Sequence, residues 1–229
     1  MNGPYGHSIK QIQQDLLSWF EISGRSFPWR NTNDPYKILV AEKLLQQTSV
    51  RPDPIKAYED LIGRYPTNKH LAAANVEVLH KFIQSLGLHY RATELVKLAQ
   101  VIQERHSGVI PSDLEHLMQL PGVGDYISRA LLCFAFCIDV PVVDTNVARI
   151  LYRLFGIQGK FPQNPSRNKI LLNLAASMIP NGMSRNFNLA LLDLGALVCQ
   201  SKEPICGDCP LLSTCMYGKK NGEDRNARA

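Results

Sequence analysis

Apolar residues recur at intervals of three and four positions along almost the whole chain, and strand-like alternation of apolar and polar residues is almost absent. One such stripe runs from Ile9 to Phe20 and stops before Gly24, a residue type that commonly ends helices. The pattern predicts an all-α protein of about ten short helices. Of its 229 residues 45% are hydrophobic and 20% are charged, which is enough apolar sequence for a buried core.

A Leu-Pro-Gly-Val-Gly sequence at residues 120–124 separates two predicted helices. The first should open at Ser112, with Glu115 completing a capping box. Gly122 and Gly124 let the backbone turn without a Cβ clash and leave amide N–H groups unobstructed. Amides at a helix start form an anion site suited to phosphate, although such turns also occur as simple helix corners.

Two carboxylates are candidates for chemistry. Asp144 precedes a helix predicted over residues 145–155, where it would act as an N-cap, as an acid–base group, or as both. Glu42 falls on the apolar side of a helix predicted from Pro35 to about residue 47. A carboxylate in that position is paired, partly desolvated, or faces a cleft.

Four cysteines near the C-terminus lie within seventeen residues, separated by six, two and five others: Cys199, Cys206, Cys209 and Cys215. Four thiolates in so short a loop predict one metal centre, and both zinc and a four-iron cluster fit them. Cys133 and Cys137 differ, because they stand four apart on the apolar helix after the turn and are predicted to be buried.

The net charge of +5 and the pI of about 8.9 fit a polyanionic partner. The sequence contains no run of eighteen apolar residues, so no membrane span is predicted. The polar start of the chain lacks a signal-peptide core, so we expect a cytoplasmic protein. The charged tail at residues 218–229 is predicted to be disordered.

The turn, the segment Val-Asp-Thr-Asn-Val at 143–147 and the cysteine spacing together resemble the iron–sulfur helix-hairpin-helix DNA glycosylases, the superfamily of endonuclease III and adenine glycosylase. The resemblance extends from Phe27 to Cys215. It implies one [4Fe-4S] cluster on the four cysteines, phosphate binding at Gly122 and Gly124, and a monomer. The implied partner is double-stranded DNA containing a mismatch, which would associate the protein with the nucleoid.

The superfamily fold implies two lobes with a cleft between them. A six-helix barrel that includes the hairpin would span residues 27–137. Residues 1–26 and 138–217 would form the cluster lobe, followed by the tail at 218–229. The target base would be flipped into the cleft, because its glycosidic bond is unreachable inside a stacked duplex.

The resemblance also assigns roles in the cleavage of an N-glycosidic bond. Asp144 would stabilise positive charge on the sugar, with Asn146 orienting it, and Glu42 would activate the leaving base or the water. Bifunctional members carry a lysine that forms a Schiff base, and the matching position here is Tyr126. Since no lysine lies between residues 107 and 153, we expect a monofunctional enzyme in which Tyr126 lines the pocket.

The excised base is less clearly indicated. Gln46, Gln47 and Thr48 resemble the adenine-glycosylase branch, where such residues enter the duplex at the opposite base. Leu189 stands where adenine enzymes have Glu or Gln, and the short chain resembles archaeal-type mismatch thymine glycosylases. The aromatic connection containing Trp29 and Arg30 supports the latter.

The predicted substrate is therefore thymine or uracil opposite guanine, with adenine opposite guanine or 8-oxoguanine as the alternative. A third, less favoured hypothesis is that the protein binds DNA without catalysing a reaction. Several basic residues are candidates for phosphate contacts: Arg129, Arg149, Lys202, Lys219 and Lys220.

Overall fold

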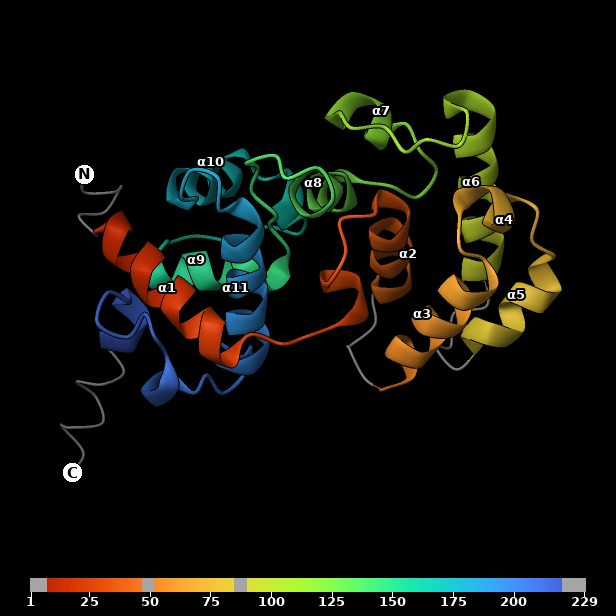
Figure 1. Ribbon diagram of the computed structural model, residues 1–229. Coiled ribbons are helices and arrows are strands. Elements are labelled where there is room, and N and C mark those ends of the chain that lie inside the picture. Colours follow the sequence, from red (N-terminus) through yellow and green to blue (C-terminus); the bar gives the residue numbers. More distant parts are fainter. Residues whose placement is uncertain (1–7, 47–51, 85–89, 220–229) are drawn as a thin grey trace. The chain divides into compact units, whose positions relative to one another are not determined.

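A computed structural model describes residues 8–46, 52–84 and 90–219, and the regular elements within these ranges are all helices (Figure 1). The prediction of an all-α protein is confirmed. The chain forms two compact units, one of residues 26–136 and one of residues 1–25 with 137–229. Gln47, Thr48, Lys220 and the tail from residue 220 lie outside the described residues.

The unit of residues 26–136 begins with a short 3-10 helix, Pro28–Arg30, and continues through seven labelled α-helices. These are α2 (Pro35–Leu45), α3 (Pro52–Arg64), α4 (Asn68–Ala72), α5 (Val76–Ile83), α6 (Arg91–His106), α7 (Leu114–Met118) and α8 (Asp125–Phe134). Helix α2 is buried on almost every side and packs against α3, α6 and α8. Asp34 caps its start, because the carboxylate accepts hydrogen bonds from the amides of Tyr36 and Lys37.

The capping box predicted at Ser112 and Glu115 is wrong. Helix α7 begins one residue later, at Leu114, and its N-cap is Asp113, whose Oδ1 accepts from the amide of His116 at 3.0 Å. An aspartate carboxylate is as good a cap as a serine hydroxyl, and here it also pairs with the His116 ring.

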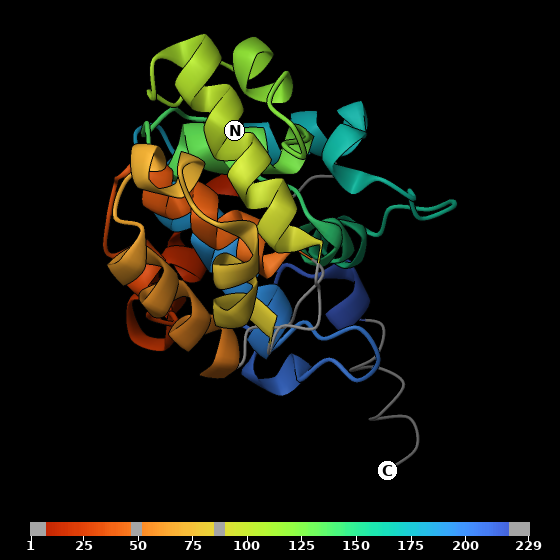
Figure 2. The same cartoon turned by 90° about the vertical axis from the view of Figure 1, so that its right-hand side faces the viewer.

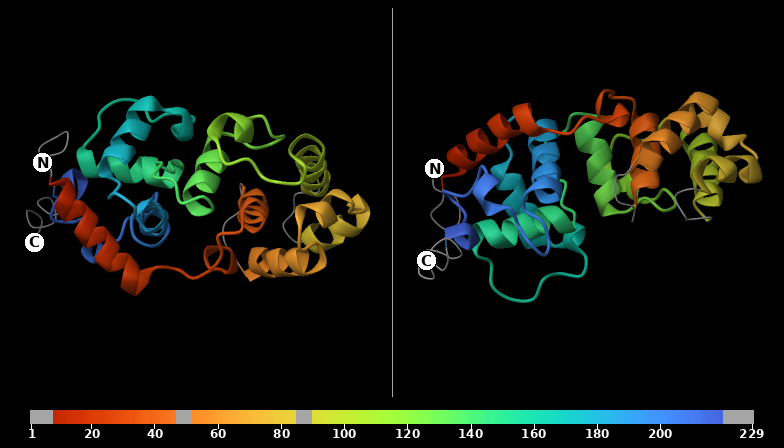
Figure 3. Two further views of the ribbon diagram at one scale, coloured as in Figure 1. Left: turned by 45° about the horizontal axis from the view of Figure 1, so that its top comes forward. Right: turned by 90° about the horizontal axis from the view of Figure 1, so that it is seen from below.

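The other unit contains α1 (Ile9–Ser23), α9 (Thr145–Phe155), α10 (Lys169–Met178) and α11 (Ser184–Leu197), with short 3-10 helices at Pro165–Arg167 and Cys206–Asp208. Apolar side chains from all four α-helices form its core. Helix α1 packs across α11 (Figure 3), and Gly24 ends it as predicted. The connection between α9 and α10 extends away from the helices of its unit (Figure 2).

A buried ion pair joins the end of α1 to α11. Asp193 has no exposed side-chain surface, and it accepts hydrogen bonds from the backbone amide and the guanidinium of Arg25 at 2.7–2.8 Å. A buried carboxylate is stable only when its oxygens are satisfied in this way.

Cys133 is buried on α8 as predicted, whereas the prediction for Cys137 is wrong. Cys137 lies beyond the end of the helix, is exposed, and has a positive φ of 55°.

Candidate active site and metal centre

The predicted hairpin is a tight turn that leads directly into α8. The amide of Val123 donates to the carbonyl of Leu120 at 3.1 Å, which closes a β-turn with Pro121 and Gly122 in its centre. Gly122 has φ of +69°, the left-handed conformation that the third position of a type II turn requires. Gly124 is the N-cap of α8 and has no side chain that could cap the helix.

Tyr126 lies in the first turn of α8, next to this glycine N-cap, and its side chain is half-buried. Glu42 is half-buried on α2, between the buried residues Ala41 and Lys43. Gln46 follows as the C-cap of α2 and is also half-buried.

Trp29 is part of the core of its unit. Its ring stacks on Phe27 with centroids 5.0 Å apart and meets Tyr58 edge-on, and only 8% of the residue is exposed. Arg30 is half-buried and its guanidinium lies 5.0 Å from the centre of the Phe27 ring. The structure therefore places Arg30, rather than Trp29, nearer to solvent.

Two buried cations, Lys43 on α2 and Arg91 on α6, were not identified from the sequence. Lys43 is 3% exposed, and its Nζ donates to the carbonyl of Gly122 at 3.2 Å and to Glu94 Oε2 at 3.4 Å. Arg91, also 3% exposed, donates to the carbonyls of Leu44 and Gln46 at the end of α2. A helix leaves its last carbonyls without helical partners, and Arg91 satisfies two of them.

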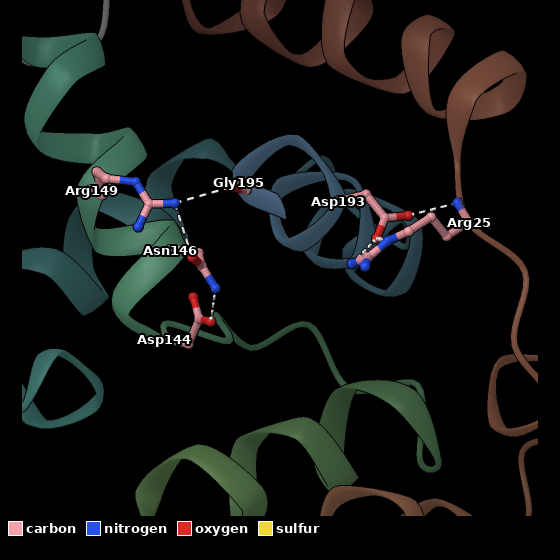
Figure 4. A network of polar contacts seen from close by, with 6 residues as sticks. All are labelled: Arg25, Asp144, Asn146, Arg149, Asp193 and Gly195. Carbon is pink, nitrogen blue, oxygen red and sulfur yellow. Dashed lines mark hydrogen bonds and ion pairs between the residues drawn. The ribbon is translucent and has the colours of Figure 1, made fainter. Parts of the chain in front are cut away.

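In the other unit, Asp144 is the N-cap of α9 and both its oxygens are held (Figure 4). Oδ1 accepts from the amide of Val147 at 2.7 Å, and Oδ2 accepts from Asn146 Nδ2 at 2.8 Å. Asn146 thus contacts Asp144 as predicted for an orienting residue. The carboxylate is half-buried and fixed in one direction by these two donors.

Arg149 extends this network inward (Figure 4). Its Nη2 donates to Asn146 Oδ1 and to the carbonyl of Gly195, both at 2.9 Å, and its Nε donates to the carbonyl of Cys199 at 2.9 Å. Burial lowers the pKa of this guanidinium, which the nearby Cys199 and Asp144 partly offset. These bonds hold the half-buried Arg149 against α11 and Cys199, and its candidate phosphate contact stays a prediction.

Gly195 allows this arrangement because Asn146 packs directly on it. A Cβ built on Gly195 would lie 2.7 Å from Asn146 Cβ, closer than side chains approach one another. Six residues earlier on α11, Leu189 is 7% exposed and offers no hydrogen-bonding side-chain group.

The four predicted metal ligands line one cavity, of about 290 Å³ including its open side, together with Arg153, Val198 and Leu212. Arg153 Nη1 lies 3.3 Å from Cys199 Sγ, and the amide of Gly218 lies 3.4 Å from Cys215 Sγ. Burial raises the pKa of the Cys209 thiol to about 11, an effect that the neighbouring thiols strengthen. Hydrogen-bond donors close to sulfur stabilise thiolates, and buried thiols ionise readily only when a bound cation neutralises them. Both features are expected at a metal centre with cysteine ligands.

Within the described ranges no three His, Cys, Asp or Glu side chains are arranged to hold a single metal ion. Zinc would draw four sulfurs to about 2.3 Å from one centre. A four-iron cluster holds each sulfur on a different iron, so its sulfurs stand farther apart. The four thiols share one cavity, and both zinc and a four-iron cluster take sulfur ligands.

Comparison with known proteins identifies the family. The sequence profile of the HhH-GPD superfamily of base excision DNA repair proteins matches residues 40–176. The chain belongs to this superfamily. The predicted membership of the helix-hairpin-helix DNA glycosylases and the predicted role in base excision repair are thereby confirmed.

Individual members of the HhH-GPD superfamily resemble the chain over most of its length. A thymine-DNA glycosylase from Aeropyrum pernix is 37% identical over 91% of this chain and 95% of its own. An adenine DNA glycosylase from Mycolicibacterium smegmatis is 40% identical over 86% of this chain and 66% of its own. The solved structure of a thermostable thymine-DNA glycosylase superimposes with a TM-score of 0.85, at 33% identity, over 93% of this chain and 97% of its own. This similarity confirms the predicted superfamily fold.

No helix in the described part of the chain is long and apolar enough to cross a membrane.

Proposed function

We propose that this superfamily member is a monofunctional DNA N-glycosylase that flips thymine or uracil mispaired with guanine out of the duplex and removes it by hydrolysis. The observation that carries the proposal is Asp144: a carboxylate at a helix start, with each oxygen held by one donor, in a chain similar to thymine-DNA glycosylases. A carboxylate held this way can stabilise a neighbouring cation without reorganising.

In the proposed reaction the bond between the sugar C1′ and the base nitrogen breaks, and positive charge develops on the sugar. Asp144 stabilises that charge from below the ring. Water supplies a hydroxyl to C1′ and releases one proton, and the departing base takes up one proton at its nitrogen. Glu42 transfers that proton, for which a half-buried carboxyl group is suited.

The choice of base rests on Leu189. Its apolar side chain cannot donate to or accept from the edge of an adenine, and a site that selects a base by its edge needs such partners. Tyr126 is proposed to line the pocket and contact the base or the sugar. The alternative, adenine opposite guanine or 8-oxoguanine, is favoured by the similarity to the mycobacterial adenine glycosylase and by Gln46, Gln47 and Thr48.

The proposal is tested with four duplexes that contain a single T·G, U·G, A·G or A·8-oxoguanine pair. Each is incubated with the protein and analysed with and without alkali. We expect strand cleavage only after alkali, and only for the T·G and U·G duplexes. Cleavage of an adenine duplex alone would favour the alternative. No alkali-labile site in any duplex would refute the enzyme, and breaks without alkali would refute the monofunctional mechanism, in which no lysine forms a Schiff base.

We further propose that Cys199, Cys206, Cys209 and Cys215 hold one [4Fe-4S] cluster. When bound, such a cluster ties the loop that carries the four thiolates into one structural unit. Arg153 and the amide of Gly218 would stabilise the thiolates by hydrogen bonding. Purified protein should be brown, with broad absorbance at roughly 400 nm. A colourless protein that contains zinc would contradict this assignment.

The remaining proposals concern the setting of the reaction. The two units are proposed to act as the barrel lobe and the cluster lobe. The hairpin amides at Gly122 and Gly124 would bind the DNA backbone. The protein is proposed to act as a monomer on mismatched double-stranded DNA, in the cytoplasm at the nucleoid.

A further inference from the structure

Lys43 is a buried cation whose partners connect three separate segments of the chain. It belongs to α2, and its ammonium reaches the hairpin at Gly122 and α6 at Glu94, which are 79 and 51 residues away in sequence. Burying an ammonium is costly unless it is paired and hydrogen-bonded. The Glu94 side chain is 46% exposed, and its distance to the ammonium, 3.4 Å, is longer than the 3.2 Å to the carbonyl of Gly122.

The contact with Gly122 determines how the turn presents its amides. The carbonyl of Gly122 and the amide of Val123 belong to one planar peptide group, so the two point in opposite directions. Lys43 holds the carbonyl while the amide bonds to Leu120, and together these bonds fix the plane of that peptide. The next residues, Gly124 and Asp125, begin α8, and the direction of their backbone depends on this plane.

The space around Gly122 shows how closely the ammonium approaches. A Cβ built on Gly122 would lie 2.6 Å from Lys43 Nζ. The turn needs glycine at this position for its positive φ, and an added methyl would also displace the end of the lysine side chain. Lys43 also places a buried positive charge beside the turn, where salt screens it poorly.

We propose that Lys43 is a positioning residue for the DNA-backbone contact of the hairpin. It holds the turn from inside the protein and adds a fixed positive charge behind the amides, without touching the DNA or the reacting atoms. This inference rests on the proposed function only in taking the hairpin as the phosphate-binding element. The proposed chemistry at Asp144 does not depend on it.

The test is the substitution Lys43→Met, which keeps an unbranched side chain of similar length and removes the charge. Binding of an undamaged duplex is measured by fluorescence anisotropy over a range of salt concentrations. We expect Kd to rise about tenfold, as for loss of a hydrogen bond to a charged group. The slope of log Kd against log salt should change by less than one phosphate contact, because Lys43 does not touch the DNA. At saturating enzyme, the single-turnover rate on the preferred mismatch should stay within about twofold, since the reacting groups are unchanged.

Two control substitutions distinguish the effect of Lys43 on the turn from the effect of net charge and from the effect of its ion pair with Glu94. Lys97→Met removes an exposed lysine from α6 in the same unit, with the same change in net charge, and should leave Kd and the salt slope unchanged. Glu94→Gln removes the ion pair but keeps the bond from Lys43 to Gly122, so affinity should change less than threefold. Equal losses for Glu94→Gln and Lys43→Met, or an unchanged Kd for Lys43→Met, would overturn the proposal.

A double-mutant cycle with Gly122→Ala covers the case in which Lys43→Met lowers folding stability. In the wild type the added methyl meets the ammonium, whereas in the Lys43→Met background the ammonium is absent. We expect the two effects on Kd to be non-additive by about tenfold. Additive effects would show that Lys43 does not act through the turn.

Failure of this inference is distinguishable from failure of the proposed function. The binding measurements use undamaged DNA and need no base removal. If wild-type protein removes no base from any mismatch, the proposed function fails while the Lys43 comparison still stands on binding alone.

Discussion

Replacing Asp144 by asparagine separates its two roles, because asparagine caps helices as well as aspartate does. In the structure Oδ1 bonds to the amide of Val147 and Oδ2 to the amide nitrogen of Asn146. The oxygen of the new side chain can keep the first bond. Its NH2 group would then face a second donor, because Asn146 cannot turn without losing its bond to Arg149.

The magnitudes differ for folding and for catalysis. Loss of one hydrogen bond at a half-buried acceptor should cost about 1–2 kcal/mol and lower Tm by roughly 2–8 °C. Loss of the carboxylate charge about 4 Å from a sugar cation, at an effective dielectric constant near 20, costs about 4 kcal/mol. This corresponds to a single-turnover rate about 10³-fold lower, with little change in Kd for DNA.

The assay for Asp144→Asn is single-turnover cleavage of the preferred mismatch, with Tm and DNA affinity measured in parallel. Asp113→Asn is the matched control, because it makes the same change at the N-cap of α7. It should alter the rate less than twofold. A rate for Asp144→Asn within tenfold of wild type would show that Asp144 is only a helix cap and would refute the assigned role.

Three further substitutions, one of them with a control, test other parts of the structure. Arg149→Met should lower the rate and Tm but leave the salt dependence of binding unchanged, since the guanidinium bonds inside the protein; a reduced salt slope would restore it as a phosphate contact. Gly195→Ala should lower Tm by several degrees and slow the reaction, because the new methyl overlaps Asn146, at a cost of about 1–3 kcal/mol. The control is Gly63→Ala, at a helical position with open space around it, which should instead raise Tm slightly. An equal change in Tm for Gly195→Ala and Gly63→Ala would contradict the packing argument. Cys206→Ser should reduce bound iron and absorbance at roughly 400 nm, and unchanged iron content would remove Cys206 from the ligand set.

Local features of the fold were predictable from sequence because their causes are local. The apolar stripe of α1 and its end at Gly24, and the side-chain cap at Asp144, depend on residues within one or two turns. Ser112 failed as a cap because the competing Asp113 is adjacent in sequence and equally suited. Such one-residue choices depend on the path of the incoming chain, which a local pattern does not contain.

Contacts between side chains that are distant in sequence were not predicted. Lys43 and Arg91 look like ordinary helical cations, yet their partners lie 45 to 79 residues away. The one available clue is that α2 has apolar residues on all sides, which leaves Lys43 no solvent-facing position. Trp29 is similar, since its burial against Phe27 and Tyr58 arises from packing of another helix.

The central proposal is that Asp144 acts on the sugar of a flipped nucleotide, and a crystal structure of the Asp144→Asn protein bound to a T·G duplex tests it most directly. The account predicts the thymidine turned out of the stack, with residue 144 below its sugar. A complex in which residue 144 faces away from the sugar, or in which no nucleotide leaves the duplex, would contradict it.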